Sequence, residues 1–553
     1  MSDTQNAVSS QELASRREFF GVIGAALAGA LLPIGPTRAG SPDSSFSVDD
    51  VRRYGIIPNA ESAASANTAA LRALVTPSGT FTGDLYFPNT TGSDVYYFND
   101  LIAFHDGIHL DLRGTTLNFA KTGNSHDSTS GFIHAIRDFS IANGTVITNY
   151  DFKGGTNTGS ALAFGGRGVD SVLFPNLYDK LLSAPMGKIL VRNLRIIGHT
   201  TGPNARGILM LGGLDGVVVD NVAIDGQKQF SQGIYYEFGW ATNEAREHER
   251  LSAHARNIHI TNLTVTNVTS EAVGSMGAYD MLIDTMRVND AGSACVIGTG
   301  EALYFRPWVP SGDLSRRPSF AVRNLVGELI RTLGVLVTGA SKISGSYLDN
   351  PPGHDNPHHL TLAQQTDLID FSLDHFQLSG SLRNFGISTS AASAQISNGT
   401  LTGFQRGIVT TQECTKFTID SVKIFDSGSF GIQIGQAVSV NSPPRLASGV
   451  IRNCVIAGSG TQGRCAGLLV STTRECLVED NRFGYTMSTD GKDENTQTQA
   501  IAVSSDAGGV TCRNNYVAAT AGGAIAYQLA GAPGRNCRIE NPRGIQSATG
   551  PWH

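Results

Sequence analysis

Charged residues are scarce in this chain: they make up 16% of its 553 residues, and the formal net charge is −6. Nucleic-acid-binding domains usually carry a strongly basic face, so this balance excludes a nucleic-acid partner. The chain also lacks a Gly-x-Ser-x-Gly elbow, a Walker loop and a dinucleotide fingerprint. We therefore predict no cofactor and no metal site.

Cysteines are few and far apart, and no Cys-x-x-Cys pair occurs. Their odd number argues against a disulfide framework, and their spacing argues against zinc or redox chemistry. We predict that they are buried as small hydrophobic residues. The seven are Cys295, Cys414, Cys454, Cys465, Cys476, Cys512 and Cys537.

Long apolar runs are missing after the first forty residues, so we expect no membrane span in the mature chain. Near the start, Arg16 and Arg17 precede an apolar stretch over 21–32, and small residues follow at 37–39. This pattern resembles a twin-arginine export signal, and the alternative is an ordinary signal peptide or membrane anchor. We predict that the twin-arginine export machinery recognises residues 1–39, and that the mature protein is secreted or periplasmic.

Glycine is abundant at 64 residues, which favours a β-rich chain with many tight turns. Residues 40–100 are predicted to form a linker and an N-terminal cap, with strands over 47–55 and 83–88. Between them, a helix is predicted over 67–75, with Asn67 as its cap. A repeating region follows over 101–545, and 546–553 are predicted to form a C-terminal tail.

The repeat unit is an apolar strand, a polar turn residue (usually Asn), a second apolar strand, a variable loop, and a strand opened by Gly or Ala. Clear copies cover 189–197, 217–224 and 258–265. Such irregular repeats are typical of a solenoid whose turn residues stack on one another. The predicted stack is Asn143, Asn193, Asn221, Asn262, Thr285, Asn324, Ser346, Ser372, Asn398, Ser421, Asn453, Asp480, Asn514 and Asn541.

These features resemble the pectate-lyase-like superfamily over roughly residues 100–545. The resemblance implies an all-β fold: a single-stranded right-handed parallel β-helix of about 12–15 rungs with a small N-terminal α/β cap. Leucine-rich repeats are the structural alternative, but the chain lacks their Leu-x-x-Leu-x-Leu phase. Many β-helix proteins form trimers, so the resemblance is compatible with a homo-oligomer.

In that superfamily, the strand after the variable loop lines a groove that binds polysaccharide. On the strand from Gly233 to Trp240, alternation directs Ile234 and Tyr236 to one face, with Tyr235 and Glu237 on the other. Glu237 is the only ionisable residue at the predicted groove positions, so it is our first catalytic candidate. The flanking carboxylates follow in the order Glu301, Asp225, Asp290 and Glu271.

Glu301 follows a strand two rungs from Glu237, a separation of about 9.6 Å that suits a carboxylate pair admitting water. The alternative interpretation is that Glu237 is a surface acid paired with Arg250 or Arg206. Aromatic and polar side chains at the groove or in the long insertions 239–255 and 299–320 are predicted to bind substrate. They are Tyr235, Trp240, Arg206, His248, Arg250, Tyr304, Arg306 and Trp308.

Three functions remain open. The leading hypothesis is a secreted carbohydrate-active enzyme that cleaves glycosidic bonds of a polysaccharide or oligosaccharide, as a glycoside hydrolase or transglycosylase with a carboxylate pair. The alternatives are a polysaccharide lyase that acts by β-elimination on a uronate polymer, and a non-catalytic solenoid adhesin or glycan-binding protein. The motifs of polygalacturonases and alginate epimerases are absent, so the resemblance names no substrate.

Overall fold

A computed structural model defines the fold, and residues Val48–His553 form one compact unit. The residues that the structure describes are 48–76, 81–121, 131–151, 160–165, 186–201, 205–212, 214–237, 255–276, 278, 280–298, 319–338, 370–382, 385–411, 414–436, 447–461, 465–484, 497–518, 525–529, 536–550 and 552. The predicted export signal at 1–39 lies outside them. No helix among them is long and apolar enough to cross a membrane.

The N-terminal cap contains the helix α2 (Ala64–Val75), preceded by short 3-10 turns at Val51–Tyr54 and Glu61–Ala63. The predicted strand over 47–55 is wrong beyond Asp50, because the Asp50 side chain accepts a hydrogen bond from the Arg52 backbone and starts a turn. Asn67 is not the helix cap. It lies inside the helix, and its buried amide accepts from Ile57 N and donates to Ile57 O.

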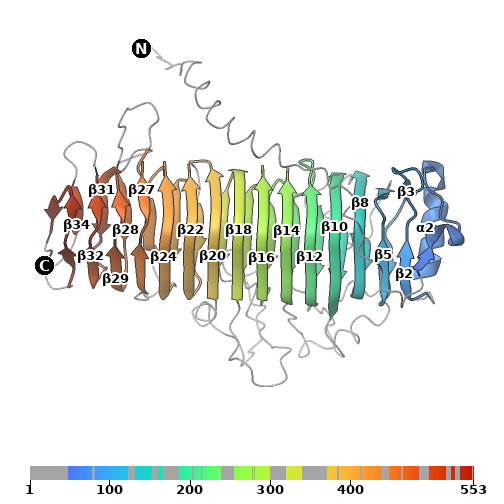
Figure 1. The fold of residues 1–553 in the computed structure, drawn as a ribbon, viewed down its shortest axis with the longest axis horizontal. Coiled ribbons are helices and arrows are strands. Elements are labelled where there is room, and N and C mark those ends of the chain that lie inside the picture. The colour runs from blue at the N-terminus through green and yellow to red at the C-terminus, as the bar shows by residue number, and fades with distance from the viewer. Residues whose placement is uncertain are drawn as a thin grey trace, which may run out of the picture. The chain divides into compact units, whose positions relative to one another are not determined.

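The rest of the unit consists of two parallel sheets whose strands stack in chain order (Figure 1). Among the described residues, sheet A has 22 strands: β1 (Val48–Asp50), β2 (Gly83–Tyr86), β3 (Val95–Phe98), β5 (Ile108–Asp111), β6 (Thr116–Lys121), β8 (Arg137–Asp151), β10 (Met186–Thr201), β12 (Leu214–Asp225), β14 (Arg256–Thr266), β16 (Asp280–Asn289), β18 (Ser319–Ile330), β20 (Asp370–Gly380), β22 (Ser393–Thr402), β24 (Lys416–Phe425), β26 (Ala447–Arg452), β27 (Val455–Ala457), β29 (Thr473–Glu479), β30 (Arg482–Phe483), β32 (Val510–Arg513), β33 (Tyr516–Val517), β35 (Arg538–Glu540) and β36 (Arg543–Gly544).

In the part of the chain that the structure describes, sheet B has 15 strands: β4 (Ile102–Phe104), β7 (Gly131–Ala135), β9 (Ser160–Gly165), β11 (Arg206–Leu211), β13 (Gln232–Glu237), β15 (Glu271–Met276), β17 (Ser293–Gly298), β19 (Leu333–Thr338), β21 (Phe385–Thr389), β23 (Arg406–Thr411), β25 (Ile432–Gln436), β28 (Cys465–Val470), β31 (Gln497–Val503), β34 (Ile525–Leu529) and β37 (Ala548–Thr549). One sheet-B strand per rung confirms the predicted parallel β-helix. The solenoid reaches beyond residue 545, because β37 pairs with β34.

The predicted turn residues occupy the left-handed region of the backbone, with φ near +50° to +63° at Asn143, Asn193 and Asn221, for example. In most rungs the two predicted strands form one continuous strand that bends at this residue. The Asn193 amide donates to Asn143 Oδ1 at 3.0 Å, and the Asn221 amide donates to Asn193 Oδ1 at 2.8 Å. Asn tolerates this conformation and links neighbouring rungs at the same time.

Two members of the predicted stack need comment. The turn position predicted at Ser372 is wrong: Ser372 lies within β20, and the left-handed residue of that rung is His375, with φ of 53°. Ser346 lies outside the described residues. Because β18 pairs directly with β20 and β19 with β21, there is no rung between them, so the turn position predicted at Ser346 is also wrong. A long insertion therefore separates these rungs in sequence but not in the sheet.

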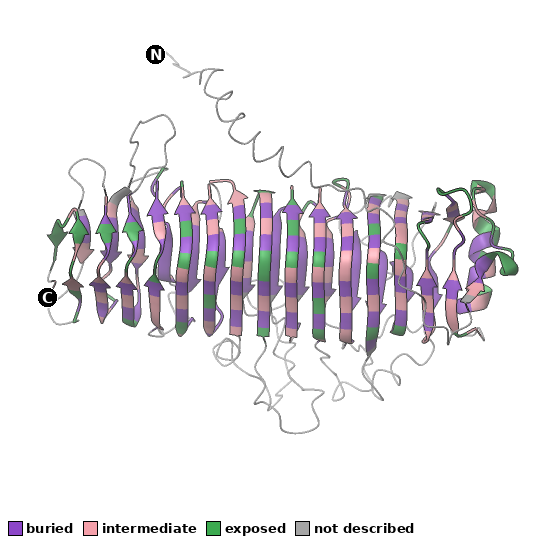
Figure 2. Cartoon of the chain, viewed as in Figure 1, coloured by how far each residue is buried: buried purple, intermediate pink, exposed green. Residues whose placement is uncertain are grey.

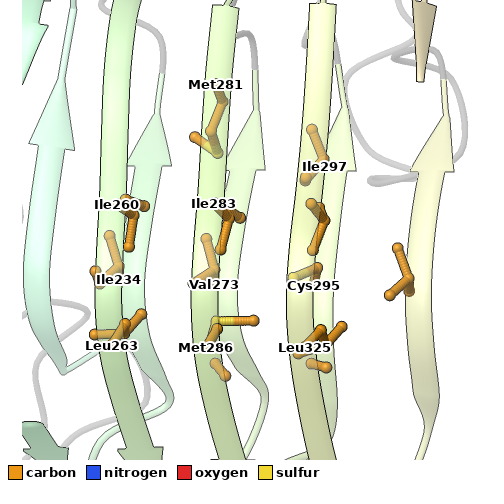
Figure 3. Packing of buried hydrophobic residues seen from close by; sticks show 14 of the residues in the cluster. Ile234, Ile260, Leu263, Val273, Met281, Ile283, Met286, Cys295, Ile297 and Leu325 are labelled. Carbon is orange, nitrogen blue, oxygen red and sulfur yellow. The ribbon is translucent and has the colours of Figure 1, made fainter. Parts of the chain in front are cut away.

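The core lies between sheets A and B and is filled by side chains that point inward from both sheets, as Figure 3 shows for part of it. Ile234, Val273 and Cys295 come from successive sheet-B strands, and Ile260 and Ile283 face them from sheet A. Burial of each such aliphatic side chain contributes about 1.5–3 kcal/mol to folding. None of the seven cysteines forms a disulfide, and six are buried, as predicted.

On its outer face, sheet A carries a column of mostly charged residues that are in register from rung to rung; Figure 2 shows the exposed positions along these strands. In rung order the column is Arg192, Asp220, Thr261, Asp284, Arg323, Asp374, Ser397, Asp420, Arg452, Glu479, Arg513 and Glu540. Arg452 pairs with Asp420 at 2.8 Å, and Arg513 pairs with Glu479. The aspartates also accept hydrogen bonds from the next turn residue, as Asp374 does from Asn398 at 2.8 Å. The column ties each rung to its neighbour.

Acid is expected to loosen this column. Burial raises the pKa of Asp374, but hydrogen bonds from Ser397 and Asn398 and the neighbouring His375 outweigh it and lower the pKa from 3.8 to about 2. A lowered folded-state pKa gives stability that is present above pH 4 and lost as the pH falls toward 2. We expect Asp374→Asn to reduce the difference between the urea midpoints at pH 5 and pH 3. Asp506→Asn, on an exposed turn, is the control; an unchanged difference in Asp374→Asn would refute this reading.

Small residues open the sheet-B strands because their Cβ positions face the next rung. A Cβ on Gly233 would lie 2.6 Å from the carbonyl oxygen of Ala272, and one on Gly407 would lie 2.5 Å from that of Gly431. The tightest approach in this row is at Gly334, where a Cβ would lie 2.1 Å from the Gly386 carbonyl oxygen. The Gly-or-Ala signal of the repeat therefore reflects close rung stacking.

Candidate functional site

The strand β13 presents two different faces. Ile234 and Tyr236 are buried in the core, and the Tyr236 hydroxyl donates to the Gly212 carbonyl at 2.8 Å, which anchors the strand. Tyr235 instead packs against a second apolar cluster formed by Ala163, Leu209 and Leu211 from neighbouring sheet-B strands. The predicted alternation is confirmed, and the outer face of sheet B bears the candidate site.

A hydrogen-bonded chain of three side chains crosses this face where the strands begin. Arg206 Nε donates to Gln232 Oε1 at 2.6 Å, and Gln232 Nε2 donates to Glu271 Oε2 at 2.9 Å. The chain runs from a cation on β11, through an amide on β13, to a carboxylate on β15. Arg206 is only 8% exposed, so its charge acts in a partly dehydrated environment where electrostatic interactions are strong.

Tyr235 lies at the centre of the site. The Arg206 guanidinium carbon is 4.6 Å from the centroid of the Tyr235 ring, a cation–π geometry. A Cβ on Gly274 would lie 2.6 Å from Tyr235 Cδ2. The ring therefore occupies the space over Gly274, and the missing side chain at this position lets the ring lie against β15.

The predicted carboxylates separate into two groups. Glu237 ends β13 in register with Met276 and Gly298. Glu271 lies at the opposite end of the strands, about 16 Å away along the strand direction. Asp225 and Asp290 precede the sheet-B strands at that same end.

Asp225 and Asp290 are bound into turns. Asp225 accepts from Asn267 Nδ2 at 2.9 Å, and Asp290 pairs with Lys228 and with Arg331. These contacts join different rungs, so they give both carboxylates a structural role in the solenoid. The remaining predicted site residues lie outside the described residues: Glu301, Trp240, His248, Arg250, Tyr304, Arg306 and Trp308.

The described site therefore brings together Arg206, Tyr235 and Glu271, with Glu237 on the same strand as Tyr235. It offers a cation, a phenol on a partly buried aromatic ring, and carboxylates, which are groups that bind and activate polar ligands. Sequence reasoning missed Gln232, the amide that orients Arg206 and Glu271. The sequence contains a signal for it: Gln232 directly precedes the strand-opening Gly233, just as Arg206 directly precedes Gly207.

The described residues form a right-handed parallel β-helix, which is the fold that the resemblance implies. A family model described as "right handed beta helix region" matches residues 385–551. A comparison with curated proteins finds no match.

Several solved structures are similar to the chain. One is the A-module of the mannuronan C-5 epimerase AlgE6 from Azotobacter vinelandii, with 11% identity, a TM-score of 0.45, and coverage of 90% of this chain and 99% of that one. Another is tailspike protein 3 of bacteriophage CBA120, with 10% identity, a TM-score of 0.44, and coverage of 98% and 70%. A third is the catalytic unit of a GH87 alpha-1,3-glucanase from Streptomyces thermodiastaticus, with 11% identity, a TM-score of 0.37, and coverage of 93% and 72%.

Proposed function

We propose that this chain is a carbohydrate-active enzyme that cleaves glycosidic bonds of a polysaccharide or oligosaccharide, as a glycoside hydrolase or transglycosylase. The observation that carries this proposal is the register of Glu237 with Met276 and Gly298. The end of β17 is thereby two rungs, about 9.6 Å, from Glu237. Glu301 follows Gly298 by three residues in sequence, which makes it the preferred partner for Glu237.

In the proposed reaction one carboxyl group protonates the leaving glycosidic oxygen, and the other activates a water molecule or an acceptor hydroxyl. Tyr235 is only partly buried, and its ring packs on the fully buried Leu209 and Leu211. The exposed part of this ring supports the binding of a sugar ring, because sugars present apolar C–H faces. The N-terminal pattern at 1–39 supports action outside the cytoplasm. Asp225 and Asp290 are less suitable as catalytic groups, because turn contacts hold them at the far end of the strands.

A lyase is the second candidate, and the stacking of Arg206 on Tyr235 favours it. β-Elimination removes the proton alpha to a uronate carboxylate, forms a carbon–carbon double bond and expels the glycosidic oxygen. A cation such as Arg206 would neutralise the uronate carboxylate, and the Tyr235 phenol would transfer a proton. The two reactions differ in their products.

The deciding experiment incubates the mature chain with a panel of neutral and acidic polysaccharides, and measures reducing ends and ultraviolet absorbance together. A hydrolase yields reducing ends without absorbance, whereas a lyase yields both, because its product contains an unsaturated uronate. A transglycosylase redistributes chain lengths, which is visible by size-exclusion chromatography. If no polymer on the panel changes length but one binds, the chain is a glycan-binding protein and the enzyme proposal is wrong.

A further inference from the structure

A second arginine opens a sheet-B strand far from Glu237. Arg406 begins β23, and the tripeptide Arg-Gly-Ile at 406–408 repeats the one at 206–208 that opens β11. The Arg406 guanidinium carbon is 5.1 Å from the centroid of the Phe385 ring and 5.9 Å from that of Phe430. Phe385 is the register partner of Arg406 on the preceding rung. Phe430 lies on the following rung, and its carbonyl oxygen accepts a hydrogen bond from the backbone N–H of Gly407. Arg406 therefore lies between two aromatic rings.

The two arginines differ in their hydrogen bonds. Arg206 Nε donates to Gln232, but the buried Nε and Nη1 of Arg406 have no acceptor among the described residues. Gln232 is the neighbour of Arg206 on the following rung. Phe430 holds the equivalent position next to Arg406, and its side chain offers no hydrogen-bond acceptor. Three residues beyond Phe430, the buried Oε1 of Gln433 also has no partner in the described part of the chain.

Such a site is costly unless something binds to it. A buried donor without an acceptor destabilises the fold because it has lost its hydrogen bonds to water, and the cost is greater when the donor is charged. Burial lowers the pKa of Arg406, an effect that the nearby Cys465 partly offsets, but a guanidinium remains protonated in proteins. The group that completes this site must therefore supply oxygen acceptors and negative charge.

We propose that Arg406 is a binding subsite for an oxyanion group, a carboxylate or a sulfate, carried by a saccharide on the outer face of sheet B. The oxyanion would accept hydrogen bonds from the guanidinium, and the rings of Phe385 and Phe430 would limit access of water. Charge-assisted hydrogen bonds of this kind are about twice as strong as neutral ones. The saccharide part of this inference rests on the proposed function, whereas the oxyanion part rests on Arg406 alone.

The position of the subsite also sets a length requirement. Five rungs separate β13 from β23 along sheet B, which corresponds to about 24 Å. A ligand that engages both Glu237 and Arg406 must span this distance. Arg406 is therefore expected to contribute to the binding of long acidic chains at the catalytic strand, and not to the turnover of short ones that reach only Glu237.

The test uses the full mature chain with Glu237→Gln, so that binding is measured without cleavage. Isothermal titration calorimetry compares carboxylated, sulfated and neutral saccharides of matched length. We expect an acidic saccharide to bind best, and Arg406→Met to weaken it at least tenfold while leaving neutral saccharides unaffected. Arg482→Met, an exposed arginine on β30 of sheet A, is the matched control. The carboxylated and sulfated arms distinguish the two oxyanions.

A second measurement keeps the test independent of the glycan. We expect the protein that retains Arg406 to unfold at a higher temperature in sodium galacturonate than in sodium chloride at equal ionic strength. This difference in unfolding temperature should disappear in Arg406→Met. Without ligand, Arg406→Met should unfold at the same or a higher temperature, because it removes a buried unpaired charge. If Arg406 only stabilised the fold, Arg406→Met would unfold at a lower temperature than the unchanged protein. The proposal is overturned if Arg406→Met binds acidic saccharides as tightly as the Arg406 chain, or if neither saccharide nor galacturonate binding depends on Arg406.

Discussion

Replacing Glu237 by Gln is expected to lower turnover by about 10²–10⁴-fold, the usual contribution of a general acid or base. The amide keeps the size of the side chain but can neither give up nor accept the proton at neutral pH. Because Tyr235 and Arg206 are unchanged, substrate affinity should stay within a few-fold of the native value. The measurement is kcat and KM on the polymer that the panel identifies.

The matched control for this variant is Glu475→Gln, the same change at an exposed residue of β29 on sheet A. It should retain native turnover. If Glu237→Gln also retains native turnover, Glu237 is an ordinary surface acid and the carboxylate-pair mechanism is wrong. A loss of affinity with unchanged kcat would instead make Glu237 a binding residue.

Gly334→Val is expected to have the largest effect on stability. Its Cβ would lie 2.1 Å from the Gly386 carbonyl oxygen and 2.9 Å from Leu378 Cδ1, and neither the backbone of β21 nor the packed core can retreat. Forced overpacking of this kind costs about 1–3 kcal/mol, and more where backbone must move. We expect a lower urea midpoint and reduced soluble yield.

Ala272→Gly, in the same row of strand-opening residues, provides the comparison. It adds backbone freedom without a clash, so it should cost about 0.5–1 kcal/mol at most. If the two variants unfold at the same urea concentration, the close approach of the rungs does not limit side-chain size in this row. A selective effect at Gly334 would confirm that the Gly-or-Ala pattern is steric in origin.

Much of the fold could be predicted from the sequence because a solenoid repeats its local rules in every rung. Two residues recur at fixed places in the repeat: an Asn that adopts a left-handed backbone conformation, and a Gly that lies close to a carbonyl group of the next rung. Both can be recognised in the amino-acid sequence. Ser372 was misplaced because a small polar residue fits several positions of a rung. The prediction of a rung with its turn at Ser346 failed because a long insertion at 339–369 concealed the direct pairings of β18 with β20 and of β19 with β21.

The site was harder to predict because its contacts join rungs whose separation in sequence depends on loop length. Arg206 is 26 residues from Gln232, and Gln232 is 39 residues from Glu271, although all three are neighbours on sheet B. The alternation of β13 indicates that Tyr235 and Glu237 face outward. It cannot indicate that the Tyr235 ring fills the space over Gly274, because that depends on the register of β13 with β15.

The charge column on sheet A also constrains how this protein can evolve. In rung order, Thr261 separates two acidic residues, Asp220 and Asp284, and Ser397 likewise separates Asp374 and Asp420. Deleting either hydroxyl rung would bring two carboxylates to adjacent positions, where like charges repel. Duplicating the Arg323 rung would place two guanidinium groups side by side. The order of charges in the column therefore determines which rungs can be duplicated or deleted without placing like charges on adjacent strands.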